Sequence, residues 1–171
     1  DGRINLSGRA KDLIIRSGHN IDPRVIEDAL GAHPAVQLCA AIGTPDAYAG
    51  ELPVAFAMLK PGAEPPTEAE LLDWTSARVD EPPARPKRVR LIDTMPMTNV
   101  GKIFKPELRR MAAEHTVRDL LAEVCEEAVV SSNLGTDGKI TVTVALPLGT
   151  GDAIRDAARA GVEKLPLQIR F

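Results

Sequence analysis

Two short, predominantly apolar segments constrain the fold of this chain more than any other feature of its sequence. Residues 35–43 and 54–59 are rich in Ala, Val, Leu and Ile, and both are short enough to be strands rather than helices. Residues with turn-forming chemistry separate them, including Pro45-Asp46 and Ala49-Gly50. The pattern predicts two buried strands joined by turns.

Signals for helices and further strands alternate on both sides of these segments. Asp22 followed by Pro23 predicts a helix that begins at residue 23 and is stopped by Gly31. Thr67 and Glu70 have the spacing of a capping box, which predicts a second helix. Further strands are expected at 3–7, 13–15, 89–92, 128–131 and 140–146, and further helices from Pro106, over 117–128 and over 152–161.

The order of these elements indicates an α+β fold with a small antiparallel or mixed sheet flanked by helices. Strands interleave with helices through hairpin-like joints, which favours this class over a doubly wound sheet. From about residue 116 the pattern changes to α-β-β-α. A chain of 171 residues has room for one domain and a small additional unit. We therefore expect one domain over residues 1–115 and an α/β extension of unassigned role over residues 116–171, here called the C-terminal extension.

Composition excludes several classes of function. Three Phe, one Trp and one Tyr are too few for a base-stacking surface, and a net charge of −3 gives no overall attraction to nucleic acid or to an anionic membrane. No apolar run approaches the length of a transmembrane helix. The two cysteines, Cys39 and Cys125, lie far apart in the sequence, so we expect no disulfide framework and a cytoplasmic location. They have no metal-ligand spacing with the histidines, so we expect no metal ligand set.

Charge is concentrated in one stretch of this nearly neutral chain. Residues 85–110 contain eight basic and two acidic residues, a local balance of +6. A basic stretch with few aromatic residues favours a phosphate-bearing small molecule over a polynucleotide. The alternative is an ordinary solvated basic face. Within the stretch, Lys102 follows Gly101 in a loop just before a helix, where a mobile cation can reach an anionic reacting centre, although a plain surface lysine has the same local sequence.

Two motifs place this loop in a wider context. Residues 8–14 (GRAKDLI) together with 17–21 (SGHNI), Pro23 and Ile26-Glu27 resemble the hinge motif of the adenylate-forming superfamily of acyl-CoA synthetases, carrier-protein adenylation domains and luciferases. Pro96-x-Thr98-x-x-Gly101-Lys102-Ile103 is similar to the final motif of that superfamily. The resemblance covers residues 1 to about 115, and Ile103-Phe104-Lys105 departs from the basic run common there.

The resemblance implies the mobile C-terminal domain of an AMP-forming ligase. Such enzymes join a carboxylic or fatty acid to ATP as an acyl-adenylate and then transfer the acyl group to coenzyme A, with Mg²⁺ accompanying ATP. By this resemblance a large N-terminal domain carries the acyl pocket and precedes Asp1, which stands where a Met would begin a complete chain. The fragment alone is expected to be inactive and to bind no cofactor by itself.

The resemblance also assigns roles to individual residues. Lys102 matches the lysine of the adenylation step, Lys11 the hinge residue, and Arg9 the arginine that approaches the nucleotide. Gly18 matches a glycine that lines the pantetheine tunnel, and Arg85 and Lys87 match positions that meet coenzyme A phosphates. The alternatives are a surface lysine for Lys11, an ion pair with Asp12 for Arg9, a plain turn glycine for Gly18, and a solvated basic face for Arg85 and Lys87.

Two other readings of the whole chain remain open. The same fold serves adenylation domains whose acceptor thiol belongs to a carrier protein, but residues 116–171 carry no serine-bearing carrier motif. A non-catalytic interaction module is the second alternative, and the joint presence of Arg9, Lys11, Gly18 and Lys102 speaks against it. The alternating strand expected at 140–146 is a candidate for pairing at a sheet edge.

Overall fold

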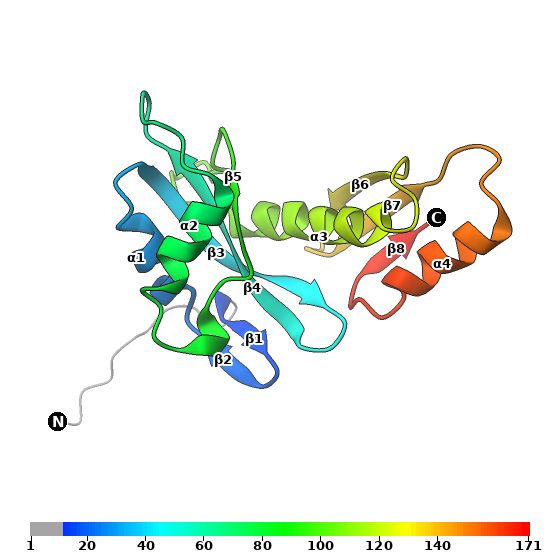
Figure 1. The fold of residues 1–171 in the computed structure, drawn as a ribbon, viewed down its shortest axis with the longest axis horizontal. Coiled ribbons are helices and arrows are strands. Elements are labelled where there is room, and N and C mark those ends of the chain that lie inside the picture. Colours follow the sequence, from blue (N-terminus) through cyan, green and yellow to red (C-terminus); the bar gives the residue numbers. More distant parts are fainter. Residues whose placement is uncertain (1–11) are drawn as a thin grey trace.

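A computed structural model describes residues 12–171, which form two β-sheets connected by one long helix (Figure 1). The strand expected at residues 3–7 lies outside the described residues. The strands are β1 (Ile14–Arg16), β2 (His19–Ile21), β3 (Val36–Asp46), β4 (Gly50–Leu59), β5 (Arg88–Leu91), β6 (Val129–Leu134), β7 (Ile140–Ala145) and β8 (Gln168–Arg170). The helices are α1 (Pro23–Gly31), α2 (Glu68–Ser76), α3 (Lys105–Ala122) and α4 (Asp152–Val162), with a short 3₁₀ helix at Pro82–Ala84.

The first sheet confirms the predicted α+β class. Its strands run in the order β2-β1-β4-β3, all antiparallel, and β5 adds to β4 in parallel. Of the turn residues that we expected between the two apolar segments, Pro45, Asp46 and Gly50 lie inside β3 and β4, which are therefore longer than predicted, and Ala49 lies in the turn between them. The reversal occurs over residues 47–49, where Asp46 Oδ1 accepts the backbone N–H groups of Tyr48 and Ala49 at 3.0 and 2.7 Å. An Asp that binds its own downstream backbone in this way defines the turn.

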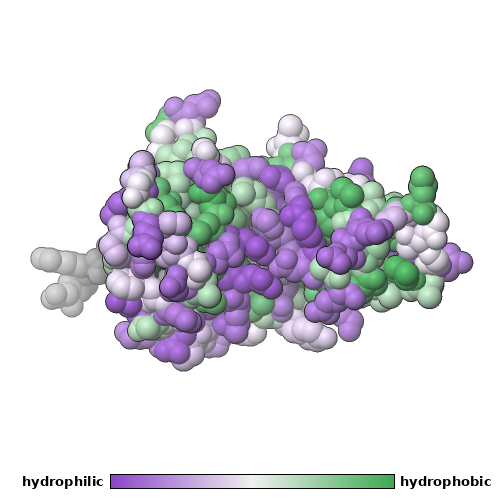
Figure 2. Space-filling view, turned by 45° about the horizontal axis from the view of Figure 1, so that its top comes forward, coloured by the Kyte–Doolittle hydropathy of each residue, from purple (hydrophilic) through white to green (hydrophobic). Residues whose placement is uncertain are grey.

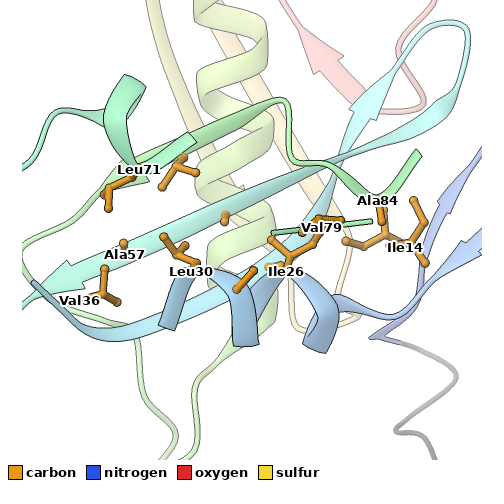
Figure 3. Packing of buried hydrophobic residues seen from close by; sticks show 13 residues of the cluster. Ile14, Ile26, Leu30, Val36, Ala57, Leu71, Val79 and Ala84 are labelled. Carbon is orange, nitrogen blue, oxygen red and sulfur yellow. The ribbon is translucent and has the colours of Figure 1, made fainter. Parts of the chain in front are cut away.

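Helices cover both faces of this sheet. On one face, α1 and α2 close a cluster that includes Ile26, Leu30 and Leu71, each fully buried (Figure 3). On the other face, Leu108 and Ala112 of α3 pack on alternate residues of the same strands. Successive residues of a strand point to opposite faces, so strands covered on both sides read as continuous apolar runs. The second cluster contains Ala40, Ile42, Val54, Phe56, Met95, Leu108 and Ala112.

Two predicted helix starts are confirmed in detail. Asp22 caps α1, and its carboxylate accepts the N–H of Arg24 at 3.0 Å with Pro23 in the first turn. In α2, the hydroxyl of Thr67 accepts the N–H of Glu70 at 3.1 Å while the carboxylate of Glu70 accepts the N–H of Thr67 at 2.8 Å. Gly31, however, is the last residue of α1 rather than its stop, because the next residue caps the helix in a right-handed conformation.

One continuous helix replaces the two that we expected between residues 106 and 128. Its first half packs on the first sheet, and Ala113, Val117 and Leu121 pack on the second. The predicted boundary between residues 115 and 116 falls inside α3, so the division into a domain and an extension stays a prediction. No helix among residues 12–171 has both the length and the apolar character needed to cross a membrane.

The second sheet belongs to the C-terminal extension and has the order β6-β7-β8. The predicted apolar face of residues 140–146 is confirmed, since Val142 and Val144 are buried against α3 and α4. The suggestion that this strand pairs at a sheet edge is wrong: β7 is central, because β8, which we did not predict, adds to it in parallel. The surface is mixed, and Figure 2 shows hydrophilic side chains across the middle of one face.

Candidate functional site

Lys102 stands at the end of a tightly bonded hairpin loop. The N–H of Thr98 donates to the carbonyl of Lys102 at 2.7 Å, and the N–H of Gly101 donates to the carbonyl of Thr98 at 2.9 Å. Gly101 has φ +73°, the left-handed conformation that follows the turn in a three-residue hairpin loop. The Thr98 hydroxyl accepts the N–H of Lys102 at 3.1 Å. Backbone and side-chain bonds therefore fix the backbone of Lys102.

The base of this loop is fixed as well. Met97 and Ile103 form an isolated antiparallel bridge, and the N–H of Phe104 donates to the carbonyl of Pro96 at 2.8 Å. Helix α3 begins at the next residue, Lys105, with Pro106 in its first turn, where a missing N–H costs nothing. The loop thus projects from the start of a long helix, whose position is set by two sheets.

A groove of about 800 Å³ runs beside the loop. Its lining includes the cations Arg24, Lys102, Lys105 and Arg109. Three of them face acids: Arg24 contacts Asp22 at 2.6 Å, Lys105 contacts Glu27 at 2.8 Å, and Arg109 lies 3.7 Å from Asp12. Lys102 is exposed, and none of residues 12–171 forms an ion pair or hydrogen bond with its ammonium group. Among the described residues that line this groove, Lys102 is therefore a cation available to an incoming anion.

One acid of the groove, Asp22, is held in its charged form. Hydrogen bonds from the Arg24 guanidinium and backbone lower the pKa of Asp22 below its usual value. A carboxylate that is already paired with a guanidinium does not compete for Lys102.

A second surface contains the residues that we expected to meet coenzyme A. The β1–β2 hairpin turns through Ser17 and Gly18, with φ of +48° and +83°, the sign pattern of a type I′ turn. Arg16 Nη1 donates to the carbonyl of Pro83 at 2.7 Å and so holds this hairpin against the segment that leads into Arg85.

Arg85 and Lys87 differ in how far their side chains are engaged. Arg85 Nε donates to the carbonyl of Val79 at 3.0 Å, so part of this guanidinium is structural. The backbone N–H of Lys87 donates to Pro53, while its side chain is exposed. Neither of these residues, nor Gly18, lines the groove beside Lys102. The structure thus links the Gly18 hairpin to the segment before Arg85 and places Gly18, Arg85 and Lys87 outside the lining of the Lys102 groove.

Replacing Gly18 tests how much of its role is conformational. A Cβ at this position meets no atom within 4 Å, so the cost of Gly18→Ala is that of the left-handed backbone, about 1–2 kcal/mol in the free energy of unfolding. Gly18→Asn should cost less, because Asn tolerates this conformation. Urea denaturation of this chain measures both. Equal losses for the two variants would contradict the interpretation.

Two predicted site residues, Arg9 and Lys11, lie outside the described residues. The proposed alternative partner of Arg9, Asp12, lies near Arg109 in the structure. Asp12 and Leu13 line the same groove as Lys102. The described residues contain no group of three or more His, Cys, Asp or Glu side chains that could hold a metal ion, so we assign no Mg²⁺ site to residues 12–171. Burial raises the pKa of the Cys39 thiol to about 11, so it is a poor nucleophile.

Sequence reasoning missed the contact between Glu27 and Lys105. Glu27 was noted only as part of a motif, and Lys105 only as a departure from a basic run. Their spacing of 78 positions gives no local signal, since the contact depends on how α1 and α3 pack around β3.

The comparisons with known proteins agree with this geometry. Residues 25–102 match the family model of the AMP-binding enzyme C-terminal domain. The marinolic acid–CoA ligase of Pseudoalteromonas sp. (strain SANK 73390) is 37% identical over 98% of this chain and 26% of its own length. The long-chain-fatty-acid–CoA ligase of Bacillus subtilis (strain 168) is 40% identical over 68% of this chain and 20% of its own length.

Solved structures also resemble this chain in fold and sequence. The crystal structure of ATP-bound MatB from Rhodopseudomonas palustris superimposes with a TM-score of 0.58 and 33% identity over 63% of this chain and 21% of that one. The chain thus spans about a fifth to a quarter of the length of the relatives that it matches. The match to marinolic acid–CoA ligase also includes the C-terminal extension. Residues 25–102 therefore belong to the AMP-binding enzyme C-terminal domain family, and the similar proteins that cover this region include acyl-CoA ligases.

Proposed function

We propose that this domain works within a longer AMP-forming acyl-CoA synthetase, which converts a carboxylic acid, ATP and coenzyme A into acyl-CoA, AMP and pyrophosphate. Lys102 carries the proposal, since its loop is rigid while its ammonium has no partner among residues 12–171. The acyl-CoA ligases among the relatives support the reaction class.

In the first step, a carboxylate oxygen of the acid attacks the α-phosphorus of ATP, and the bond to pyrophosphate breaks. The reactants are both anionic, and negative charge builds up around the α-phosphorus. The Lys102 ammonium offsets this repulsion and stabilises the transition state. Arg9 is proposed to contact the nucleotide. A loop bonded at both its tip and its base delivers the cation without further ordering of the backbone.

In the second step, the thiol of coenzyme A attacks the acyl carbonyl, and AMP leaves. We propose that the domain rotates about Lys11 between the steps and presents its second surface to the same site. Gly18 then leaves room for the pantetheine arm, and Arg85 and Lys87 face the coenzyme A phosphates. The separation of these residues from the Lys102 groove supports two working surfaces on one domain.

The remaining parts of the proposal concern the rest of the enzyme. We propose that an N-terminal domain holds the acyl pocket and most of the ATP site, including its Mg²⁺, and that residues 12–171 alone are inactive. The C-terminal extension would move with residues 12–115, because α3 is continuous through the boundary and its far half is buried against the second sheet. A cytoplasmic location is part of the same proposal.

ATP–pyrophosphate exchange by the full-length enzyme tests this function. We expect exchange with at least one acid from a panel of fatty and aryl acids, followed by acyl-CoA formation when coenzyme A is added. Exchange without acyl-CoA formation would favour a carrier-protein acceptor. A properly folded enzyme that shows no exchange with any acid would favour a non-catalytic module.

A further inference from the structure

Glu27 and Lys105 form an ion pair that ties the base of the Lys102 loop to the rest of the domain. Lys105 Nζ lies 2.8 Å from Glu27 Oε1, and the two side chains are only 19% and 21% exposed. Lys105 is the first residue of α3 and follows Lys102 by three positions. The pair therefore acts at the point where the loop joins the helix.

The carboxylate of Glu27 is itself fixed from a second direction. Glu27 Oε1 also accepts the N–H of Ala41 at 2.9 Å. Ala41 belongs to β3, which is the last strand in the order of the first sheet, so its outward N–H has no strand partner there. One carboxylate oxygen thus links α1, the edge of the sheet and the start of α3. The backbone of Glu27 takes part as well, since its carbonyl accepts the thiol of Cys39 at 3.3 Å.

The position of Lys105 is costly unless this pair forms. The N-terminus of a helix carries partial positive charge, so a cation in its first turn is disfavoured. The N-cap residue of α3 is Phe104, whose side chain makes no capping hydrogen bond. The helix start therefore lacks the contact that a polar N-cap side chain would provide. Glu107 in the same turn is favourable there, and Glu27 adds a direct contact with Lys105 that holds the start of the helix.

We infer that Glu27 and Lys105 are positioning residues for adenylation, acting on the reaction through the placement of Lys102. This inference rests on the proposed role of Lys102. A catalytic group displaced by about 1 Å can cost about 100-fold in rate. A loosened loop base should therefore reduce the adenylation rate and leave the thiolation surface, which lies elsewhere, unaffected.

The test uses the full-length enzyme and measures each half-reaction in a single turnover. Glu27→Gln keeps an acceptor for Ala41 but removes the charge, and Lys105→Met keeps the stem but removes the cation. We expect both variants to lower kcat for adenylation about 10- to 100-fold, with little change in KM for ATP and normal thiolation from a supplied acyl-adenylate. Lys105→Arg should retain most of the rate, and the double variant should be no slower than either single one.

Asp119→Asn is the control, since it removes two ion pairs away from the loop, with Arg90 at 2.8 Å and with Arg88 at 3.4 Å. Adenylation losses no larger than in this control, or equal losses in both half-reactions, would overturn the inference while leaving the role of Lys102 intact. Normal adenylation in Lys102→Ala would instead remove the proposed function of Lys102, and the inference with it.

Discussion

Replacing Lys102 by alanine is expected to slow acyl-adenylate formation by the full-length enzyme about 100- to 1000-fold, the usual cost of losing one preorganised group that stabilises transition-state charge. The loss should appear in kcat, because the cation acts where negative charge develops during the step. Thiolation from a supplied acyl-adenylate should proceed normally, since Lys102 does not lie on the second surface. ATP–pyrophosphate exchange and a single-turnover thiolation assay measure the two rates.

Lys139→Ala serves as the control for loss of a surface lysine. Lys139 is exposed in the C-terminal extension, where it faces Asp137 at 3.7 Å. Both half-reactions should be unaffected in this variant. Adenylation at the same rate in Lys102→Ala and Lys139→Ala would contradict the role proposed for Lys102.

Replacing Lys11 by proline is expected to separate the two half-reactions even more sharply. A hinge residue must change its backbone angles between the two orientations, whereas proline fixes φ near −65°. One half-reaction should keep its rate, and the other should fall by about 100-fold or more because its groups are no longer brought into place. Single-turnover assays of both steps measure the result.

Lys11→Ala is the matched control, because it removes the charge and keeps the freedom of the backbone. It should leave both steps within a few-fold of the parent rates. If Lys11→Pro also left both steps normal, the hinge would have to lie elsewhere in the chain.

The elements that the sequence predicts well are those with local signals. The caps at Asp22 and Thr67 are made by side chains that bind backbone groups two or three residues away. The buried face of β7 follows from strict alternation, which needs no knowledge of its partner. These contacts depend on residues close together in the sequence, and so they can be recognised without the fold.

The errors arise where tertiary packing decides. Helix α3 continues through residues 115–117 because its two halves are buried against different sheets, and the Thr116 hydroxyl lies 2.7 Å from that of Thr44. Strand β8 has only three residues, and pairing with β7 defines it. Neither effect has a signature within a local window of sequence.

The basic stretch over residues 85–110 is a further case in which tertiary contacts decide what the sequence cannot show. The local balance of +6 suggested a phosphate-binding surface, yet acids from outside that stretch approach several of its cations. Asp119 forms an ion pair with Arg90, Glu114 with Arg110, and Glu27 with Lys105. Lys87 and Lys102 have no such partner among residues 12–171, and of these two only Lys102 lines the groove, which the composition of the stretch does not reveal.

The central claim is that one domain serves two reactions with two surfaces. The most direct measurement compares Lys102→Ala with Lys87→Ala in both half-reactions of the full-length enzyme. The account predicts a crossover: Lys102→Ala slows only adenylation, and Lys87→Ala raises the coenzyme A concentration needed for half-maximal thiolation about tenfold while leaving adenylation normal. Loss of the same half-reaction in both variants would contradict it.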